Sequence, residues 1–256
     1  MRNEKLWWIA RNNWVKLSYN QYPGRGIVIG TSEDGRYAVQ VYWIMGRSEN
    51  SQNRVFKCEG GRLFTEAKDP SKMKDPSLII YNAMAEYADS FVVSNGDQTD
   101  TVIEALQQNE YVDLSNALCQ RQYEPDSPNF TPRITGMCML IGGGEYSAEL
   151  SLIRKSEFIT EKDGSCERFY YEYGQIVPGF GFCVTTYNGD GNPLPAFTGE
   201  LYPLSIEGNI DDVINTYWSV LNEENRVSLA VKFIDLTTRK SETRVINRFT
   251  QVGINV

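Results

Sequence analysis

Short β-rich runs separated by turn residues dominate the first part of the chain. Residues 27–31 and 37–43 are mostly β-branched, aromatic or apolar, and Asp34-Gly35 lies between them. An Asp-Gly pair between two such runs is typical of a β-hairpin. The short apolar run 90–94 predicts a further buried strand, because it ends at an Asn-Gly turn signal.

The same pattern continues towards the end of the sequence. Strands are predicted on both sides of the glycines at 142–144, on both sides of a turn at 162–165, at 182–187, and as a closing pair at 226–236 and 243–250. Many strands without regularly alternating helices indicate an α+β protein rather than a series of βαβ units. Because no linker divides the chain, one domain is predicted over residues 1–256.

The clearest helical pattern covers residues 210–222. Asn209 is a suitable N-cap, and two Asp residues follow in the first turn, where they interact favourably with the helix dipole. One face at helical spacing is apolar and is predicted to pack on the core: Ile210, Val213, Ile214, Tyr217, Val220 and Leu221. Two shorter helices are predicted, one from an N-cap at Thr99 or Asp100 to residue 108 and one at 113–122.

The absence of histidine is the most informative feature of the composition. The 256 residues are 41% hydrophobic and 23% charged, as in ordinary globular proteins, but they contain no His. This excludes His-based catalytic triads, HExxH zinc proteases and Cys-His proteases. Acid–base chemistry must therefore use Glu, Asp, Lys, Tyr or Cys.

The charge of the chain is acidic overall but basic at its beginning. Lys and Arg number 25 against 33 Asp and Glu, so the net charge is -8 and no nucleic-acid partner is expected. Residues 1–55 hold eight basic and four acidic side chains, a local balance of +4. A basic cluster within an acidic body suits a small anion better than a polymer.

Five cysteines are spread along the chain without a CxxC pair, and with no His they predict no metal site. Free thiols fit a reducing compartment, so a cytoplasmic location is expected. No signal-peptide core and no run of membrane-spanning length is present, so no membrane partner is expected. Trp7, Trp8 and Trp14 are predicted to anchor the N-terminal segment to the body of the protein.

Four blocks of short motifs occur in a fixed order between about residues 20 and 205. They are Tyr22-Pro-Gly-Arg25-Gly with Tyr42-x4-Arg47-Ser48-x4-Asn53-Arg54; Tyr81-Asn82 with Val92-Val93-Ser94-Asn95-Gly96-Asp97-Gln98-Thr99-Asp100; Tyr123-Glu124-x-Asp126 with Thr131-Pro132-Arg133-Ile134; and Thr185-Thr186-Tyr187-x-Gly189-Asp190 with Leu194-Pro195-x-Phe197-x-Gly199-Glu200. In this order the blocks resemble the archaeal type of IMP cyclohydrolase. The resemblance leaves an N-terminal and a C-terminal extension outside it.

The resemblance implies a four-layer αββα sandwich of two antiparallel sheets, as in the N-terminal-nucleophile hydrolases. The chain starts with Met1-Arg2, so this fold would occur without a processed nucleophile. The implied reaction is a step of purine biosynthesis that needs no cofactor: ring closure of formamidoimidazole carboxamide ribonucleotide to IMP with loss of water. Two alternatives are open: an amide or cyclic-amidine hydrolase acting on a related nucleotide, and a non-catalytic purine-nucleotide-binding protein. The oligomeric state is also open, with a homo-oligomer as one alternative.

Three residues are predicted to be catalytic: Tyr81, Glu124 and Arg133. A Tyr hydroxyl orients or protonates an oxygen, a buried Glu with a raised pKa moves protons, and an Arg stabilises an oxyanion. The predicted substrate-binding residues are Arg25, Tyr42, Arg47, Arg54, Asn82, Asn95, Asp97, Thr99, Asp100, Tyr187 and Asp190. Arginine binds phosphate oxygens in pairs, and short polar side chains suit a ribose or a base. The competing interpretation of these residues is structural: surface charge, core packing and turn or cap formation.

Overall fold

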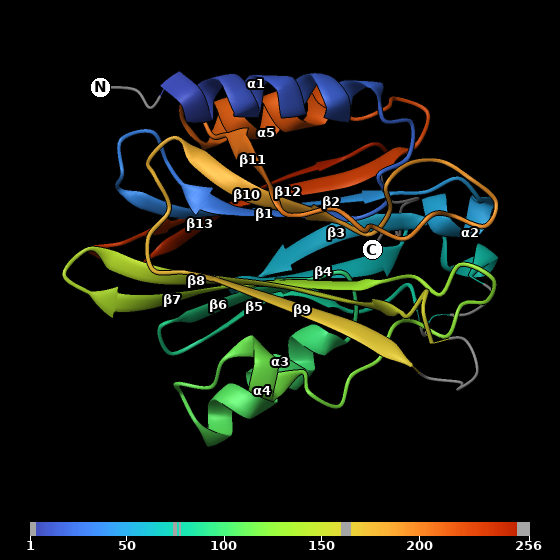
Figure 1. Ribbon diagram of the computed structural model, residues 1–256, viewed down its shortest axis with the longest axis horizontal. Coiled ribbons are helices and arrows are strands. Elements are labelled where there is room, and N and C mark those ends of the chain that lie inside the picture. Colours follow the sequence, from blue (N-terminus) through green and yellow to red (C-terminus); the bar gives the residue numbers. More distant parts are fainter. Residues whose placement is uncertain (1–3, 74–75, 77, 160–164, 250–256) are drawn as a thin grey trace, which may run out of the picture.

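The computed structural model describes residues 4–73, 76, 78–159 and 165–249. In these residues the chain forms two antiparallel sheets that stack face to face, with helices on both outer faces (Figure 1). One sheet is covered by α1 (Glu4–Tyr19) and α5 (Ile210–Val220), and the other by α3 (Gln98–Gln108) and α4 (Leu114–Ala117). The predicted α+β class and the αββα order of layers are confirmed, whereas the likeness to N-terminal-nucleophile hydrolases stays a prediction.

The upper sheet in Figure 1 has the strand order β11-β10-β1-β2-β12-β13. Its strands are β1 (Gly26–Thr31), β2 (Tyr37–Met45), β10 (Phe180–Thr185), β11 (Tyr202–Ser205), β12 (Arg226–Asp235) and β13 (Ser241–Asn247). β1 and β2 form the predicted hairpin, and Gly35 in its turn has a φ of +73°, a conformation that favours glycine. The predicted closing pair is also confirmed, although β13 starts two residues earlier than expected and residue 250 lies outside the described residues.

The lower sheet has the strand order β3-β4-β5-β6-β7-β8-β9. Its strands are β3 (Arg54–Glu59), β4 (Arg62–Ala67), β5 (Asn82–Tyr87), β6 (Ser90–Ser94), β7 (Arg133–Gly142), β8 (Glu145–Lys155) and β9 (Cys166–Tyr173). The strand predicted at 90–94 and the two strands around 142–144 are confirmed as β6, β7 and β8. β9 confirms the strand predicted after residue 165, whereas residues 156–159, before the predicted turn, are not in a strand and residues 160–164 lie outside the described residues.

Three apolar clusters hold the layers together. The largest lies between the sheets and includes Ile27, Tyr42 and Leu150, which are fully buried. A second cluster lies under α1 and α5, and a third, around Val102 and Met137, lies under α3 and α4. Burying one such side chain contributes about 1.5–3 kcal/mol, so these contacts fix both sheets to each other and to their helices.

The helix predicted at 210–222 is confirmed as α5, which ends two residues early. The Asn209 side chain accepts hydrogen bonds from the backbone N–H groups of Asp211 and Asp212 at 2.9 and 3.1 Å. The predicted apolar stripe is buried except for Val220, which is half-buried. Two boundaries were wrong: α3 begins after Asp97, not after Thr99 or Asp100, and α4 is one short turn instead of 113–122.

The predicted anchoring by the N-terminal tryptophans is correct for Trp14 and wrong for Trp8. The Trp14 indole packs edge-on against Tyr217 at 4.7 Å and donates a hydrogen bond to Ser205 on β11. Trp8 is 65% exposed, because it lies on the face of α1 that points away from the sheet. Trp7 is half-buried and carries the Arg11 guanidinium over its ring.

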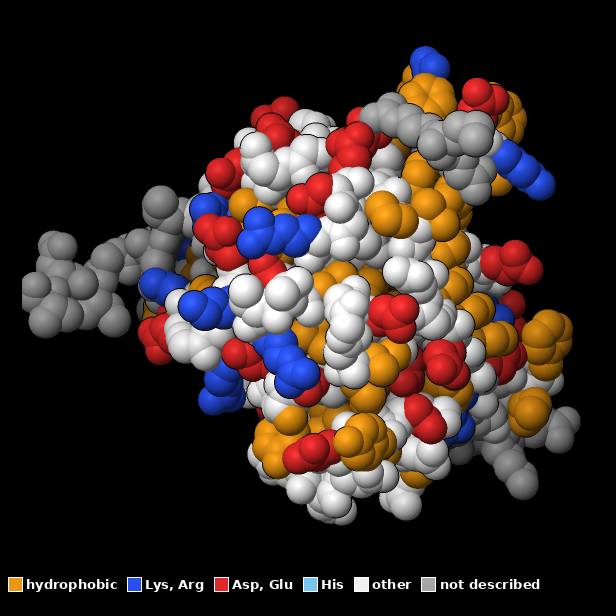
Figure 2. Space-filling view, turned by 90° about the vertical axis from the view of Figure 1, so that its left-hand side faces the viewer, with side chains coloured by type: hydrophobic (Ala, Val, Ile, Leu, Met, Phe, Trp, Pro, Cys, Tyr) orange, Lys and Arg blue, Asp and Glu red, His pale blue; other side chains and the backbone are white. Residues whose placement is uncertain are grey.

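The surface mixes charges of both signs. On the face in Figure 2, acidic and basic side chains of the described residues are interspersed with hydrophobic ones. In the part of the chain that the structure describes, no helix has the length and apolar character needed to cross a lipid bilayer.

Candidate active site

Five of the predicted site residues converge at the end of the sandwich where β1 begins. Arg25 precedes β1, Tyr42 lies on β2, Arg54 starts β3, Tyr81 precedes β5, and Glu124 lies in the loop before β7. The hydroxyl oxygens of Tyr42 and Tyr81 are 2.7 Å apart. The charges of Arg25 and Arg54 act on each other, on Tyr81 and on Glu124. These five residues are called the Arg–Tyr–Glu cluster below.

The two arginines of the cluster keep N–H groups without a partner. Arg54 is 1% exposed, and two of its nitrogens donate to the carbonyls of Ser51 and Met45. Its Nη1 and the Nε of Arg25 are buried and make no hydrogen bond. Burial and the neighbouring charge of Arg25 lower the pKa of Arg54. Guanidinium groups with free donors offer hydrogen bonds that an anion can accept.

Glu124 is the buried carboxyl group of the cluster, with 2% exposure. Its backbone N–H donates to the carbonyl of Thr131 at 2.9 Å, which holds the loop against the start of β7. Burial raises the pKa of Glu124 to about 7, although the charges of Arg25 and Arg133 oppose this shift. A carboxyl with such a pKa exists in both protonation states near neutral pH, as a proton shuttle requires.

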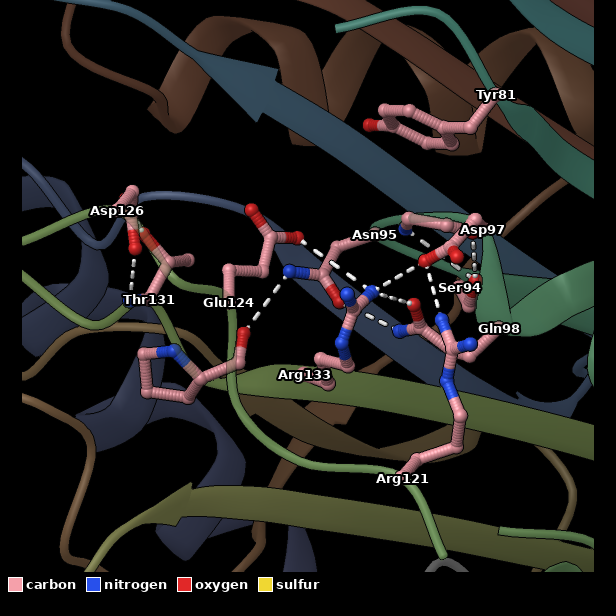
Figure 3. Close-up of polar contacts among 12 residues, drawn as sticks. Tyr81, Ser94, Asn95, Asp97, Gln98, Arg121, Glu124, Asp126, Thr131 and Arg133 are labelled. Atoms are coloured by element: carbon pink, nitrogen blue, oxygen red, sulfur yellow. Dashed lines mark hydrogen bonds and ion pairs between the residues drawn. The ribbon is translucent and has the colours of Figure 1, made fainter. Parts of the chain in front are cut away.

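Arg133 is held beside Glu124 by a network of polar contacts (Figure 3). Its Nη1 donates to Asp97 at 2.6 Å and to Gln98 at 2.7 Å, and lies 3.9 Å from Oε1 of Glu124. Its Nε donates to the backbone carbonyl of Gln122 at 2.8 Å. Asp97 also pairs with Arg121, so one half-exposed carboxylate orients two guanidinium groups. The hydroxyl of Tyr81 approaches the same region from the other side (Figure 3).

The turn between β6 and α3 fits closely against these groups. A Cβ atom on Gly96 would lie 2.7 Å from Gln98, 2.8 Å from Nη1 of Arg133 and 3.1 Å from Oε1 of Glu124. Asn95 in the same turn donates to the carbonyl of Pro132 and accepts from the N–H of Ile134. Asn95 therefore joins the turn to the start of β7, from which Arg133 projects.

Three other predicted binding residues are bonded within the fold. Thr99 shares a 2.6 Å hydrogen bond with Ser94, and Asn82 donates to Asp100 at 2.7 Å. These contacts tie α3 to β5 and β6 beside the cluster. They show a structural role, and contact of these residues with a substrate stays a prediction.

Arg47, Asp190 and Tyr187 form the rim of the site together with Tyr22. Arg47 is ion-paired with Asp190 and stacks over the ring of Tyr22 at 4.9 Å. Tyr22 in turn stacks on Tyr187 with a centroid distance of 6.1 Å. The Tyr187 hydroxyl is 2.6 Å from that of Thr131. Arg47 thus has its carboxylate partner already, unlike Arg25 and Arg54.

Sequence reasoning missed several residues that hold the site. They are Tyr22, Gln98, Arg121 and Thr131, of which Thr131 donates from its backbone and its side chain to Asp126. All except Arg121 stand inside the motif blocks, so their positions in those motifs were the available signal. Arg121 carries no motif signal, because only the fold brings it to Asp97.

The most voluminous of the described cavities lies away from the cluster. It measures about 540 Å³ and is lined by residues near the β1–β2 turn and the start of α5, including Glu33, Tyr37 and Phe233. It contains none of the predicted site residues. Among the described residues, no group of three Cys, Asp or Glu is arranged to hold a metal ion.

The sequence of the chain matches a known protein family over most of its length. The model of the IMP cyclohydrolase-like protein family matches residues 22–240, a span that includes every predicted site residue. The chain therefore belongs to this family, and the resemblance seen in the motif blocks is confirmed. The match also extends beyond residue 205, into the segment that holds α5 and β12.

Two archaeal relatives carry the name IMP cyclohydrolase. The protein of Methanosphaera stadtmanae is 31% identical over 171 residues, which are 65% of this chain and 73% of the relative. The protein of Methanothrix thermoacetophila is 32% identical over 122 residues, or 45% of this chain and 57% of the relative.

Proposed function

We propose that this protein is an IMP cyclohydrolase, which closes formamidoimidazole carboxamide ribonucleotide to IMP with loss of water. The observation that carries the proposal is Glu124, a buried carboxyl with a pKa of about 7, placed beside Tyr81 and two arginines with free N–H groups. Membership of the family and the names of its archaeal relatives support the choice of substrate.

The reaction needs proton transfer more than it needs a strong nucleophile. The carboxamide nitrogen attacks the formyl carbon and loses a proton, while the formyl oxygen gains one. The formamido nitrogen then loses its proton as the hydroxyl leaves as water, which forms the C=N bond of the ring. Glu124 takes and returns these protons, Tyr81 orients the departing oxygen, and Arg133 holds Glu124 in place. Since both reacting groups belong to one molecule, orientation supplies much of the acceleration.

The arginine pair of the cluster would hold the anionic part of the substrate. Arg25 and Arg54 offer unpaired N–H groups, and a phosphate monoester accepts several such hydrogen bonds. Arg47 is the weaker candidate for this role because Asp190 already binds it. In this arrangement Tyr187 and the turn at 95–100 face the ribose and the base.

The proposed reaction also bears on the partner, the cofactors, the location and the domain organisation of the protein. The partner is a small nucleotide rather than a nucleic acid, no metal or cofactor takes part, and the protein works in the cytoplasm. The chain acts as one domain, in which α1, before the family match, packs onto β11 of the core.

The test is to incubate purified protein with the formamido ribonucleotide and to measure IMP formation against the uncatalysed rate. We expect turnover that survives treatment with a chelator. IMP binding without turnover would instead support a non-catalytic nucleotide-binding protein. Turnover of a related nucleotide alone would support the hydrolase alternative.

A further inference from the structure

The lower sheet has one edge that nothing in the described structure covers. β9 pairs only with β8, and all eight of its residues are at least partly exposed. In Figure 1 this strand closes the lower sheet on the side nearest to the viewer. A long strand with a free edge offers unpaired N–H and C=O groups to another strand.

Two of the other sheet edges are partly protected. On β3, both backbone groups of Phe56 are bonded by the side chain of Asn247, the last residue of β13. β11 is short and contains Pro203, whose carbonyl accepts a hydrogen bond from Asn13 of α1. Among the described strands, β13 pairs only with β12, and none of its seven residues is buried. Of these two open edge strands, β9 is the longer, with eight residues.

Symmetry restricts how two copies of β9 can pair. In an antiparallel pair, successive opposite residues alternate between hydrogen-bonded and non-hydrogen-bonded positions. A twofold axis must map each pair onto an equivalent pair, so one residue must lie opposite its own copy. Only a few registers meet this condition. In these registers the numbers of two opposite residues add up to twice the number of the residue at the axis, which is even. Glu167 therefore never lies opposite the partner's Glu172.

One allowed register is complementary in charge. With Tyr170 opposite the partner's Tyr170, Arg168 lies opposite the partner's Glu172, and the symmetry repeats this pair. Arg168 and Glu172 are both exposed in the free chain. On the opposite face of the strand, Phe169 lies opposite the partner's Tyr171, which gives two aromatic cross-strand pairs. Arg168 donates to the carbonyl of Arg121 through Nη2, and its other N–H groups suffice for a carboxylate.

We propose that a second copy of this chain pairs with β9 in this register, and that the protein is a twofold dimer with one continuous sheet. The partner is a second copy because the strand is complementary to itself. Exposed apolar side chains at the two ends of the strand fit this arrangement. Phe158 and Ile159 flank its start and Val177 its end, and antiparallel pairing brings these ends together.

The test compares charge variants of the full chain by sedimentation velocity at micromolar concentrations. Wild type should be a dimer. Arg168→Glu or Glu172→Arg should weaken dimerisation at least about tenfold, because two opposite-charge pairs become like-charge pairs. The double variant with both changes should restore the dimer. Glu59→Arg makes the same change of charge on β3, at the other edge of the sheet, and should have no effect. Thermal melts check that each variant is folded.

A disulfide tests the register independently of charge. Only residue 170 lies opposite itself, at a Cα distance that a disulfide spans. Tyr170→Cys should therefore form several times more covalent dimer on mild oxidation than wild type, which has its own exposed cysteines. Tyr171→Cys, which faces the partner's Phe169, is the control and should not. A monomeric wild type, charge reversals without effect, or equal cross-linking of both cysteine variants would each overturn the proposal.

Discussion

Glu124 combines burial with a position among guanidinium groups, and this balance makes its proton exchangeable near neutral pH. Full exposure would return its pKa to the ordinary value of 4.5, and a direct ion pair would lower it further. The 3.9 Å separation from Arg133 avoids such a tight pair. As a consequence, the contribution of Glu124 to the stability of the folded protein depends on pH.

Stability should reveal the raised pKa directly. Between the ordinary value of 4.5 and the folded-state pKa of about 7, the folded protein binds more protons than the unfolded chain. The free energy of unfolding therefore falls as the pH rises through this window, by up to about 3 kcal/mol. Glu124→Gln cannot ionise, so its stability relative to wild type should increase between about pH 5 and pH 8. Denaturant titrations at both pH values measure this, and a pH-independent difference would contradict it.

The two free donors of the arginine pair lead to a binding prediction. Arg54→Gln should weaken IMP binding about ten- to a hundredfold and leave inosine binding nearly unchanged, because the lost partner is the phosphate. Arg47→Ala should have the smaller effect on IMP, since Asp190 already holds that guanidinium. Calorimetric titration with both ligands measures the difference. Equal losses for IMP and inosine in Arg54→Gln would assign the arginine another role.

At the scale of elements, the turn between β6 and α3 sets the position of the reacting groups. The Cβ of Gly96→Ala would come within about 3 Å of the Arg133 and Glu124 side chains, which must then shift. We expect kcat to fall at least about tenfold, because small displacements at an active site are costly. Gly174→Ala is the matched control, as its added Cβ meets nothing within 4 Å. The measurement is kcat for both variants, and similar values would show that the turn tolerates the side chain.

Elements with strong local signals could be predicted from the sequence, and those shaped by tertiary contacts could not. The β1–β2 hairpin could be predicted because Asp34-Gly35 marks its turn, and α5 because Asn209 caps its start. α1 could not be predicted because its hydrophobic pattern does not match its burial. It buries Ala10, the polar Asn13 and Leu17, while several of its large apolar residues face outwards. Asn13 is buried because β11 offers it a carbonyl.

The start of α3 was misplaced for a related reason. Asp97 precedes the helix but makes no capping bond with its side chain. Its carboxylate binds Arg121 and Arg133 instead, so a residue with good capping chemistry serves the site. Local propensity cannot reveal this, since both arginines are distant in the sequence.

At the scale of the whole molecule, the sandwich brings together residues that the motif blocks named without showing that they are close in space. Arg25, Tyr42, Arg54 and Tyr81 come from both sheets, and Glu124 reaches them from a loop. The motif blocks identified these residues, but their convergence depends on how the two sheets stack. The free N–H groups of Arg25 and Arg54 are visible only in the folded chain.

The central claim is that Glu124 moves protons in ring closure, and single-turnover kinetics with the formamido ribonucleotide tests it most directly. Glu124→Gln keeps the size and an acceptor oxygen, so IMP affinity should stay near that of wild type. The rate of ring closure should fall about 100- to 10,000-fold, the usual contribution of a general acid–base group. Tyr81→Phe should cost less, because its hydroxyl only orients an oxygen. A near-wild-type rate in Glu124→Gln would contradict the account and turn attention to Asp126 and Asp190.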